Sequence, residues 1–401
     1  MSYTPPQEIL EKYADLLINF ALGNCKGIKP GDVVWMRLHE SAKPFYAPLR
    51  NAILKAGGHP LIQYYPDGVG AAEEYDLSSP KQLEFGFDKY YGGIIEQVDH
   101  MVYVISEADK YELQDVEPSR IITKNNALRS YMKQRNAKES AGKFTWTIGM
   151  YGTPAMAADV GLSEEEYWGQ IIKACYLDAV DPKVEWKRVT EEIERVREAL
   201  NALSIQKLHV EGEHIDLWVG LGANRQWLGG SGANIPSFEL FVSPDWRQTN
   251  GEIFFNQPLY RYGNSIEGIK LRFKDGVVVE SSATKGEALL KELLATENAD
   301  KIGEYSLTDG SLSRITHLMG ETLYDENMGG TEGNTHLAVG NAYQSSYTSD
   351  PSTVTDQQWK DWGYNQSQEH TDIISTEKRT VTAILPDGSE KIIYSDGHFT
   401  L

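Results

Sequence analysis

The sequence predicts a chain of two lobes: an α/β lobe with a parallel sheet over residues 1–205, followed by a β-rich α+β lobe over residues 206–401. Three observations support this prediction. Helical and strand-like segments alternate through the first 150 residues, a helical stretch covers 163–203, and short strands with Asp-Gly turns dominate from about 205 onward. A length of 401 residues also favours more than one domain, each with its own hydrophobic core.

The N-terminal lobe shows two helical patterns and four strand-like segments. Apolar residues recur at helical spacing from Ile9 to Phe20 and again from Phe45 to Leu54, where Gly57-Gly58 ends the second pattern. Short apolar runs typical of buried strands follow or precede these helices, at residues 33–38, 60–65, 101–106 and 144–150. Strand–helix–strand units of this length predict a parallel sheet.

The stretch over 163–203 is predicted to be helical, because Ser163 and Glu166 form a capping box and an apolar stripe runs from Trp186 to Leu200. Residues 207–221 then alternate with period two, and one further helix is expected near 285–296. Turn signals stand at three Asp-Gly pairs, which are Asp275-Gly276, Asp387-Gly388 and Asp396-Gly397. We place the domain boundary near 205 because the pattern changes there.

Charge and composition exclude several classes of function. The chain has 38 Lys+Arg against 58 Asp+Glu, a net charge of −20, so we expect no nucleic-acid partner and no membrane partner. The polar, locally basic segment 107–143 is interpreted as a solvated helical face. Two cysteines, Cys25 and Cys175, make no disulfide framework and are expected to be buried thiols in helices. With no signal-like start and no long apolar run, a cytoplasmic location is expected.

The α/β half invites a dinucleotide-binding interpretation, but its glycine motifs do not support one. Gly68-Val69-Gly70 and Gly220-Leu221-Gly222 both lack the third glycine that lets strand and helix pack closely. The sequence contains no P-loop, no GxSxG elbow and no HExxH motif.

Candidate functional residues gather in the second half of the chain. Six of the nine histidines lie after residue 205, and histidine is the commonest metal-binding side chain. His370 and Asp372 are spaced as i and i+2, so on an extended strand both side chains point to the same face, as a metal ion requires. The ordinary alternative is a surface strand with two polar residues.

Other candidates are carboxylates and a histidine in apolar or small-residue surroundings. Glu239 lies in an apolar, strand-like run, where a carboxylate is costly to bury unless it is paired or bound to metal. The same argument applies more weakly to Glu304 and Glu326. His336 is flanked by small residues, and Tyr343 follows seven positions later. Taken singly, each of these fits an ordinary structural role.

Together, these segments carry a family resemblance. In order, the chain has N-I-P-x-x-E (234–239), G-E (303–304), D-E-N (325–327), H-x-A-x-G-x-A-Y (336–343) and H-x-D (370–372). With the opening segment YADLLINFALGNCKGIKPGDVVWMR, the chain resembles, over essentially its whole length, the aminopeptidase T family of metallo-aminopeptidases, which includes thermophilic and staphylococcal-type leucyl aminopeptidases. The resemblance implies that the β-rich lobe is the metal-binding, catalytic one. It implies metal ligands at Glu239, Glu304, His336, His370 and Asp372, a further acidic site residue at Glu326, and a site tyrosine at Tyr343.

The resemblance also implies a chemistry and an assembly. Two histidines with several carboxylates suit two adjacent divalent ions (zinc, cobalt or manganese) that share a carboxylate and an activated water. Glu304 would bridge the ions or accept a proton, and Tyr343 would donate a hydrogen bond to the developing oxyanion or touch a metal ion. The expected substrates are short peptides with a free N-terminus, and the expected assembly is a homodimer with an enclosed site.

Two departures from the family pattern leave other functions open. Phe238 stands where the family often has glycine, and the segment between Asn327 and His336 is longer than in the best-known members. Both changes could reshape the substrate pocket without removing a ligand. One alternative is a metal-dependent amidohydrolase acting on a non-peptide small molecule. The other is a catalytically silent binding protein of the same fold.

Overall fold

The computed structural model describes residues 3–68, 70–261 and 263–401, and it divides the chain into two compact units. Unit 1 comprises residues 1–187, 231–236 and 262–264; unit 2 comprises 188–230, 237–261 and 265–401. Packing therefore divides the chain within the long helix α11 (Pro182–Ala202) rather than after it. The sequence-based division into 1–205 and 206–401 stays a prediction about folding domains.

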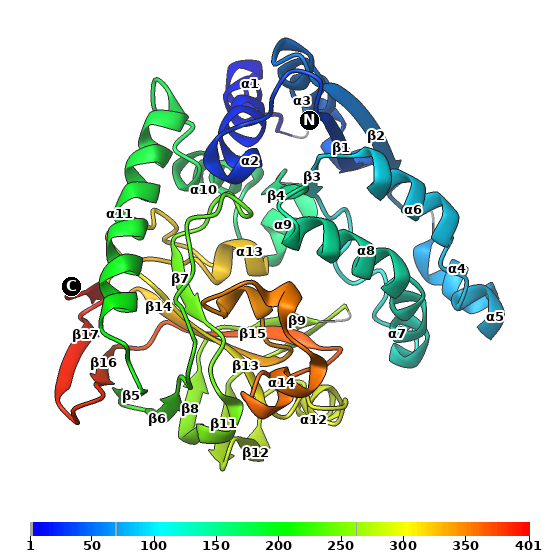
Figure 1. The fold of residues 1–401 in the computed structure, drawn as a ribbon. Coiled ribbons are helices and arrows are strands. Elements are labelled where there is room, and N and C mark those ends of the chain that lie inside the picture. Colours follow the sequence, from blue (N-terminus) through cyan, green and yellow to red (C-terminus); the bar gives the residue numbers. More distant parts are fainter. Residues whose placement is uncertain (1–2, 69, 262) are drawn as a thin grey trace. The chain divides into compact units, whose positions relative to one another are not determined.

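Unit 1 is built on a four-stranded parallel sheet in the order β2-β1-β3-β4. Its strands are β1 (Val33–His39), β2 (His59–Tyr65), β3 (His100–Ile105) and β4 (Thr145–Met150). These bounds confirm all four predicted strands and the parallel arrangement (Figure 1). Helices cover both faces: Ile95 and Tyr131 pack with Trp35 on one face, whereas Tyr13 and Phe45 stack where α1 meets α3.

The helices of unit 1 follow the predicted pattern with one correction. They are α1 (Gln7–Leu16), α2 (Leu22–Cys25), α3 (Lys43–Lys55), α4 (Ala71–Leu77), α5 (Pro80–Leu83), α6 (Asp88–Gln97), α7 (Pro118–Ala127), α8 (Arg129–Ser140), α9 (Pro154–Asp159) and α10 (Glu164–Ala174), with a π-helical turn at Leu17–Ala21 and a 3-10 turn at Glu40–Ala42. The capping box of Ser163 and Glu166 is present. The stretch 163–203 is not one helix, because Tyr176 has φ +56° and Pro182 can begin but not continue a helix.

Unit 2 contains an eight-stranded antiparallel sheet in the order β12-β11-β8-β6-β5-β16-β17-β18. Its strands are β5 (Lys207–Gly212), β6 (Ile215–Gly220), β8 (Asn250–Phe255), β11 (Ile269–Lys274), β12 (Val277–Ser282), β16 (Arg379–Ile384), β17 (Glu390–Ser395) and β18 (His398–Phe399). The three Asp-Gly pairs lie in the turns β11–β12, β16–β17 and β17–β18, as predicted.

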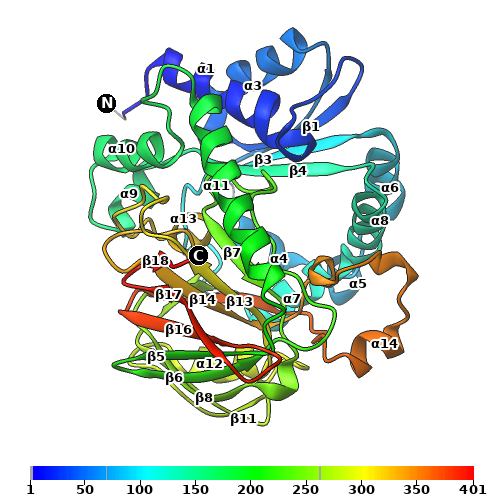
Figure 2. The same ribbon diagram turned by 60° about the vertical axis from the view of Figure 1, so that its left-hand side comes forward.

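A second, smaller sheet of unit 2 has four antiparallel strands in the order β15-β14-β13-β7. They are β7 (Glu239–Val242), β13 (Ile302–Thr308), β14 (Asn334–Gly340) and β15 (His370–Ser375). One face carries buried apolar side chains such as Tyr305, Leu307 and Leu337, and Figure 2 shows the two sheets as adjacent layers. The opposite face carries the candidate site.

Short elements complete the fold. They are β9 (Leu259–Arg261), β10 (Asn264–Ile266), α12 (Glu287–Leu294), α13 (Thr322–Asp325), α14 (Asp356–Asp361), and 3-10 turns at Trp246–Gln248, Gln344–Ser346 and Pro351–Thr353. The helix predicted near 285–296 is confirmed as α12. An α/β part followed by a β-rich part is therefore the observed fold class.

Several smaller predictions are also resolved. Cys175 is buried at the end of α10, but the prediction was wrong for Cys25, which is half-buried and has φ +61°. Met1, Ser2 and Val69 of the motifs considered above lie outside the described residues. Within the described ranges, no helix combines the length and apolar character needed to cross a membrane.

Candidate metal centre

The candidate residues lie on all four strands of the smaller sheet in unit 2. Glu239 begins β7, Glu304 lies on β13, and His336 lies on β14. His370 and Asp372 lie on β15. Because side chains alternate along a strand, the pairing register decides whether they meet on one face.

The register brings the candidates to the same face. Ala338 on β14 is paired with Glu304 on one side and with Asp372 on the other, and Gly340 is paired with His370. Paired residues point to the same face of a sheet, so these acidic and imidazole groups project together. The methyl group of Ala338 and the absent side chain of Gly340 leave room between them.

A β-bulge shapes β13 just before its glutamate. The register of β13 against β14 shifts between Ile302 and Glu304. At Gly303, a Cβ atom would lie 2.3 Å from the carbonyl oxygen of Asn341 and 2.6 Å from that of Gly340. Glycine is required for this close approach, and bulges change the direction of neighbouring side chains.

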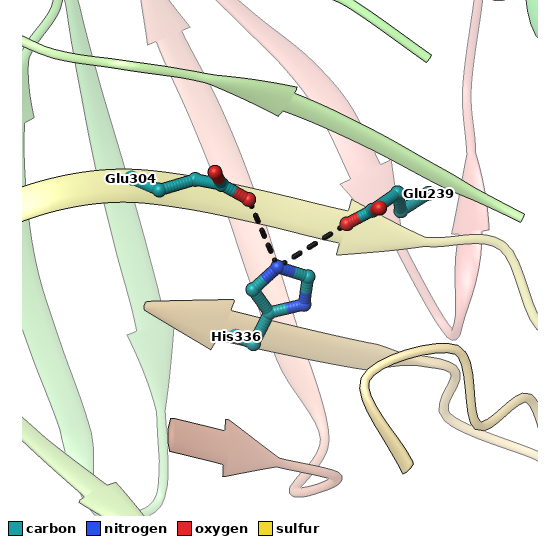
Figure 3. A group of neighbouring side chains, drawn as sticks. All are labelled: Glu239, Glu304 and His336. Carbon is teal, nitrogen blue, oxygen red and sulfur yellow. Dashed lines mark hydrogen bonds and ion pairs between the residues drawn. The ribbon is translucent and has the colours of Figure 1, made fainter. Parts of the chain in front are cut away.

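His336 lies at the middle of the group. Its Nε2 is 3.1 Å from Glu304 Oε1 and 3.2 Å from Glu239 Oε2 (Figure 3). Ser306, which is paired with His336 across the sheet, donates a hydrogen bond of 3.2 Å to Glu239 Oε2. One imidazole edge is therefore shared by two buried carboxylates.

The His370–Asp372 pair has the geometry that its spacing predicts. His370 Nε2 lies 3.4 Å from Asp372 Oδ1 and 3.9 Å from Glu304 Oε2. The other ring nitrogen, Nδ1, lies 2.8 Å from the backbone carbonyl oxygen of Asn341. Because Nδ1 donates to this carbonyl, Nε2 is the ring nitrogen that faces the carboxylates and that could bind a cation after losing its proton.

Glu326 and Tyr343 come from segments outside the strands. Glu326 caps the short helix α13, and one of its carboxylate oxygens lies in a group with His336 and Asp372 whose potential ligand atoms are all within 4.8 Å. Tyr343 follows β14, and its ring packs 4.7 Å from the His370 ring and 5.8 Å from the Phe241 ring. Every predicted site residue is thus brought into one region of unit 2.

The chemistry of this group fits a divalent cation. Glu239, Glu304 and His336 form a second set of ligand atoms within 4.8 Å of one another, and all three residues are buried. Glu304 Oε2 is buried and accepts no hydrogen bond from the described residues. Buried carboxylates are stable only when paired or metal-bound, and here the acids outnumber the imidazoles. Mixed imidazole and carboxylate ligation suits zinc, cobalt or manganese.

The pKa values reflect this crowding of charge. Burial raises the pKa of Glu304 to about 7, although a hydrogen bond with His336 opposes the change. Burial and the neighbouring carboxylates of Glu239 and Asp372 raise the pKa of Glu326 well above its ordinary value. Burial opposes the charged form of His336, but its hydrogen bonds to Glu239 and Glu304 raise its pKa well above normal.

On β15, the two pKa shifts go in opposite directions. Burial alone would lower the pKa of His370, but the charge of Asp372 raises it to about 9. Burial alone would raise the pKa of Asp372, but the charge of His370 lowers it to about 2. Without a cation, imidazolium groups therefore supply the positive charge that these carboxylates require.

Sequence reasoning missed residues that hold the site together. Ser306 donates a hydrogen bond to Glu239, and the Asn341 carbonyl accepts one from His370. Asn327 donates to the Glu326 carboxylate and accepts from the backbone N–H of Phe238, directly before β7. Ser306 lies two residues after Glu304 on β13, so alternation could have found it if a strand had been predicted there. The other two contacts depend on loop conformations that carry no periodic signal.

The two departures from the family pattern have defined places in the structure. Phe238 is fully buried directly before β7, and its backbone N–H donates to Asn327 Oδ1 at 2.6 Å. The segment between Asn327 and His336 forms the end of the connection from α13 to β14 and the first two residues of β14, and Gly329, Gly330 and Gly333 lie within it. Whether either departure alters the substrate pocket stays a prediction.

Comparison with known proteins identifies the family. A family model described as thermophilic metalloprotease (M29) matches residues 6–399. The chain belongs to this family. The resemblance to the aminopeptidase T family of metallo-aminopeptidases is therefore confirmed, and the chain is a metallopeptidase, an enzyme of the hydrolase class.

Relatives of this M29 chain match it over almost its whole length. Aminopeptidase PepS of Streptococcus thermophilus is 27% identical over 426 residues, covering 98% of both chains. Aminopeptidase T of Thermus thermophilus is 29% identical over 417 residues, again covering 98% of both. The solved structure of wild-type AmpT from Thermus thermophilus superposes with a TM-score of 0.84 at 26% identity, covering 98% of this chain and 100% of that one. These matches place the chain among the metal-dependent aminopeptidases.

Proposed function

We propose that this M29 chain removes the N-terminal residue from short peptides, using two divalent metal ions held by the residues on the smaller sheet of unit 2. The observation that carries the proposal is the projection of carboxylates and imidazoles from all four strands onto one face around His336. Two groups of potential ligands meet at His336, and their four carboxylates carry more negative charge than one divalent ion balances, which supports a site for more than one cation. The proposed ligands are Glu239, Glu304, Glu326, His336, His370 and Asp372.

The proposed mechanism assigns each chemical task to a residue. When bound, divalent ions polarise the scissile carbonyl and lower the pKa of water to about 7. Glu304 would accept the proton of the attacking water and deliver it to the leaving amine, through its buried oxygen Oε2, which has no hydrogen-bond partner among the described residues. Tyr343 donates a hydrogen bond from its hydroxyl to the oxygen that gains negative charge.

The acidic surroundings explain a restriction to the first residue of a peptide. A free α-amine is cationic and is attracted to the carboxylates of the site, whereas an internal peptide bond brings no such charge. The chain's net charge of −20 adds a weak attraction for cationic N-termini, which salt screens. The charge of the amine therefore selects the end of the peptide at which cleavage occurs.

The experiment that tests the function compares two matched substrates. Leucine p-nitroanilide offers a free amine, and its N-acetylated form has the same scissile bond without the charge. We expect hydrolysis of the free form at a rate at least about 100-fold above the acetylated form, because losing a charged partner costs several kcal/mol. Equal cleavage of both would favour the small-molecule amidohydrolase. Metal binding without any hydrolysis would favour the silent binding protein.

Three further parts of the proposal concern the context of the reaction. Zinc, cobalt and manganese are the proposed metals, because the ligands are a mixture of imidazole and carboxylate. A homodimer and a cytoplasmic location are proposed from the family resemblance and from the low cysteine content. Size-exclusion chromatography with light scattering tests the homodimer, and a measured molar mass equal to that of one chain would contradict it.

A further inference from the structure

We propose that Asn327 is a positioning residue that fixes the Glu326 carboxylate relative to Glu239 and thereby sets the affinity of the site for divalent metal. The inference rests on the proposed function, because it assumes that these two acids bind metal. Asn327 is the third residue of the D-E-N segment, and neither the family pattern nor the mechanism above gives it a task.

The first observation is the set of contacts that the Asn327 amide makes. The residue is fully buried. Its Oδ1 accepts a hydrogen bond of 2.6 Å from the backbone N–H of Phe238, the residue directly before Glu239. Its Nδ2 donates to the Leu323 carbonyl at 3.1 Å and to Glu326 Oε1 at 3.4 Å. One amide therefore contacts the chain at one proposed ligand and the carboxylate of another.

The second observation is that Thr308 Oγ1 and Asn334 Nδ2 fix only the backbone of Glu326, donating to its carbonyl at 3.3 and 2.9 Å, whereas Asn327 contacts its carboxylate. Glu239 begins β7 at the edge of the smaller sheet, whereas Glu326 ends the four-residue helix α13, which belongs to no sheet. A helix of one turn has little stability of its own. The position of the Glu326 carboxylate thus depends on the side chains that fix the end of α13.

The third observation concerns the chemistry of the amide. A buried amide can accept from one group and donate to two others, and here it accepts from the Phe238 N–H and donates to the Leu323 carbonyl and to Glu326. One oxygen of the Glu326 carboxylate lies with ligand atoms of His336 and Asp372, all within 4.8 Å of one another. A donor beside Oε1 fixes the orientation of this carboxylate, and hydrogen-bond partners of metal ligands typically contribute 10–100-fold to affinity.

The experiment measures metal affinity in folded, full-length protein. Zinc or manganese dissociation constants are obtained by competition with a chelator, with bound metal counted by mass spectrometry and folding followed by thermal denaturation. The test variant is Asn327→Ala, and Asn327→Ser serves if the alanine variant does not fold. We expect the dissociation constant to rise by about 10–100-fold, with leucine p-nitroanilide hydrolysis falling at limiting metal and recovering at high metal.

A matched control separates positioning from general stability. Asn201 makes a similar pair of hydrogen bonds, accepting from the Trp227 N–H at 2.8 Å and donating to the Trp227 carbonyl at 3.2 Å, but it contacts none of the proposed ligands. Asn201→Ala and Asn201→Ser should lower thermal stability and leave metal affinity within about twofold, because a lost hydrogen bond acts on folding alone.

The outcomes distinguish this inference from the function on which it rests. A dissociation constant within twofold of wild type in the folded Asn327 variants would overturn the positioning role while leaving the proposed function intact. An equal loss of affinity in the Asn201 variants would also overturn it, because the effect would then be structural. Wild-type protein that binds no divalent metal would instead overturn the proposed function and this inference with it.

Discussion

Two buried histidines, one in each unit, show how different the surroundings of the same side chain can be. In unit 1, His100 on β3 has both ring nitrogens partnered: Nε2 lies 2.9 Å from Asp32 Oδ2, and Nδ1 lies 2.7 Å from Thr145 Oγ1. In unit 2, His336 has Nε2 between two carboxylates, and its Nδ1 has no hydrogen-bond partner among the described residues.

The difference lies in the balance of charge around the ring. One carboxylate and one hydroxyl complete the hydrogen bonds of His100, so this region needs no further ligand. Around His336, the carboxylates of Glu239, Glu304 and Asp372 all lie within 3.9 Å of one nitrogen. A buried excess of negative charge is unfavourable until a cation is added. The comparison therefore distinguishes a structural histidine from one that belongs to a binding site.

The largest effect is expected from Glu304→Gln. This change keeps the size of the side chain, removes one charge and removes the proton acceptor, so the turnover number should fall by about 10²–10⁴-fold. The metal-free variant should be at least as stable as wild type, because mutual repulsion among the acids decreases. Steady-state kinetics and thermal denaturation measure both. Wild-type turnover in this variant would show that Glu304 does not have the proposed role.

A second change tests whether the strand β15 pair takes part in metal binding. His370→Ala should lower metal occupancy at micromolar metal and raise the dissociation constant at least about tenfold, because one proposed ligand is lost. Mass spectrometry of the native protein measures the occupancy. Unchanged metal content would remove His370 from the site.

A third change tests whether the histidine of unit 1, His100, has a structural role only. His100→Ala removes the partner of Asp32 and Thr145 and should lower the free energy of unfolding by about 2 kcal/mol. Metal content and turnover per folded molecule should stay within about twofold of wild type. Urea denaturation gives the stability. A loss of bound metal in this variant would break the distinction between the two histidines.

The smallest effect is a pH dependence in unit 1. Burial alone would raise the pKa of Asp32, but hydrogen bonds from the Lys29 backbone N–H and from His100 lower it. A carboxyl with a lowered pKa in the folded state stabilises the protein above its ordinary pKa, and the effect is lost as the pH falls. Asp32→Asn should therefore cost up to about 1 kcal/mol at pH 7 and progressively less below about pH 4. Equal stability losses at pH 7 and pH 3 would contradict this assignment.

Much of the fold could be predicted from local pattern. The four strands of unit 1 are short apolar runs between helical segments, and Asp-Gly pairs mark three turns of unit 2. The break between α10 and α11 was missed because apolar spacing on both sides suits a helix, whereas the interruption depends on Tyr176 and Pro182. The half-buried position of Cys25 depends on tertiary packing, which local spacing does not reveal.

The candidate site also has features that local sequence pattern predicts and features that it does not. The convergence of His370 and Asp372 follows from the two-residue period of a strand. The meeting of Glu239 with Glu304 and His336 requires the pairing order of four strands, which the residues alone do not give and which the family resemblance supplied. The contact of Asn327 with Phe238 joins residues 89 positions apart and depends on a loop conformation, so no pattern in the sequence predicts it.

The most direct test of the central claim combines metal content with activity in one preparation. Leucine p-nitroanilide hydrolysis and bound metal per chain are measured before chelation, after EDTA, and after zinc, cobalt or manganese is added back. We predict that activity and metal are lost together, that both return together, and that full activity requires two ions per chain. Undiminished hydrolysis by metal-free protein would contradict the account.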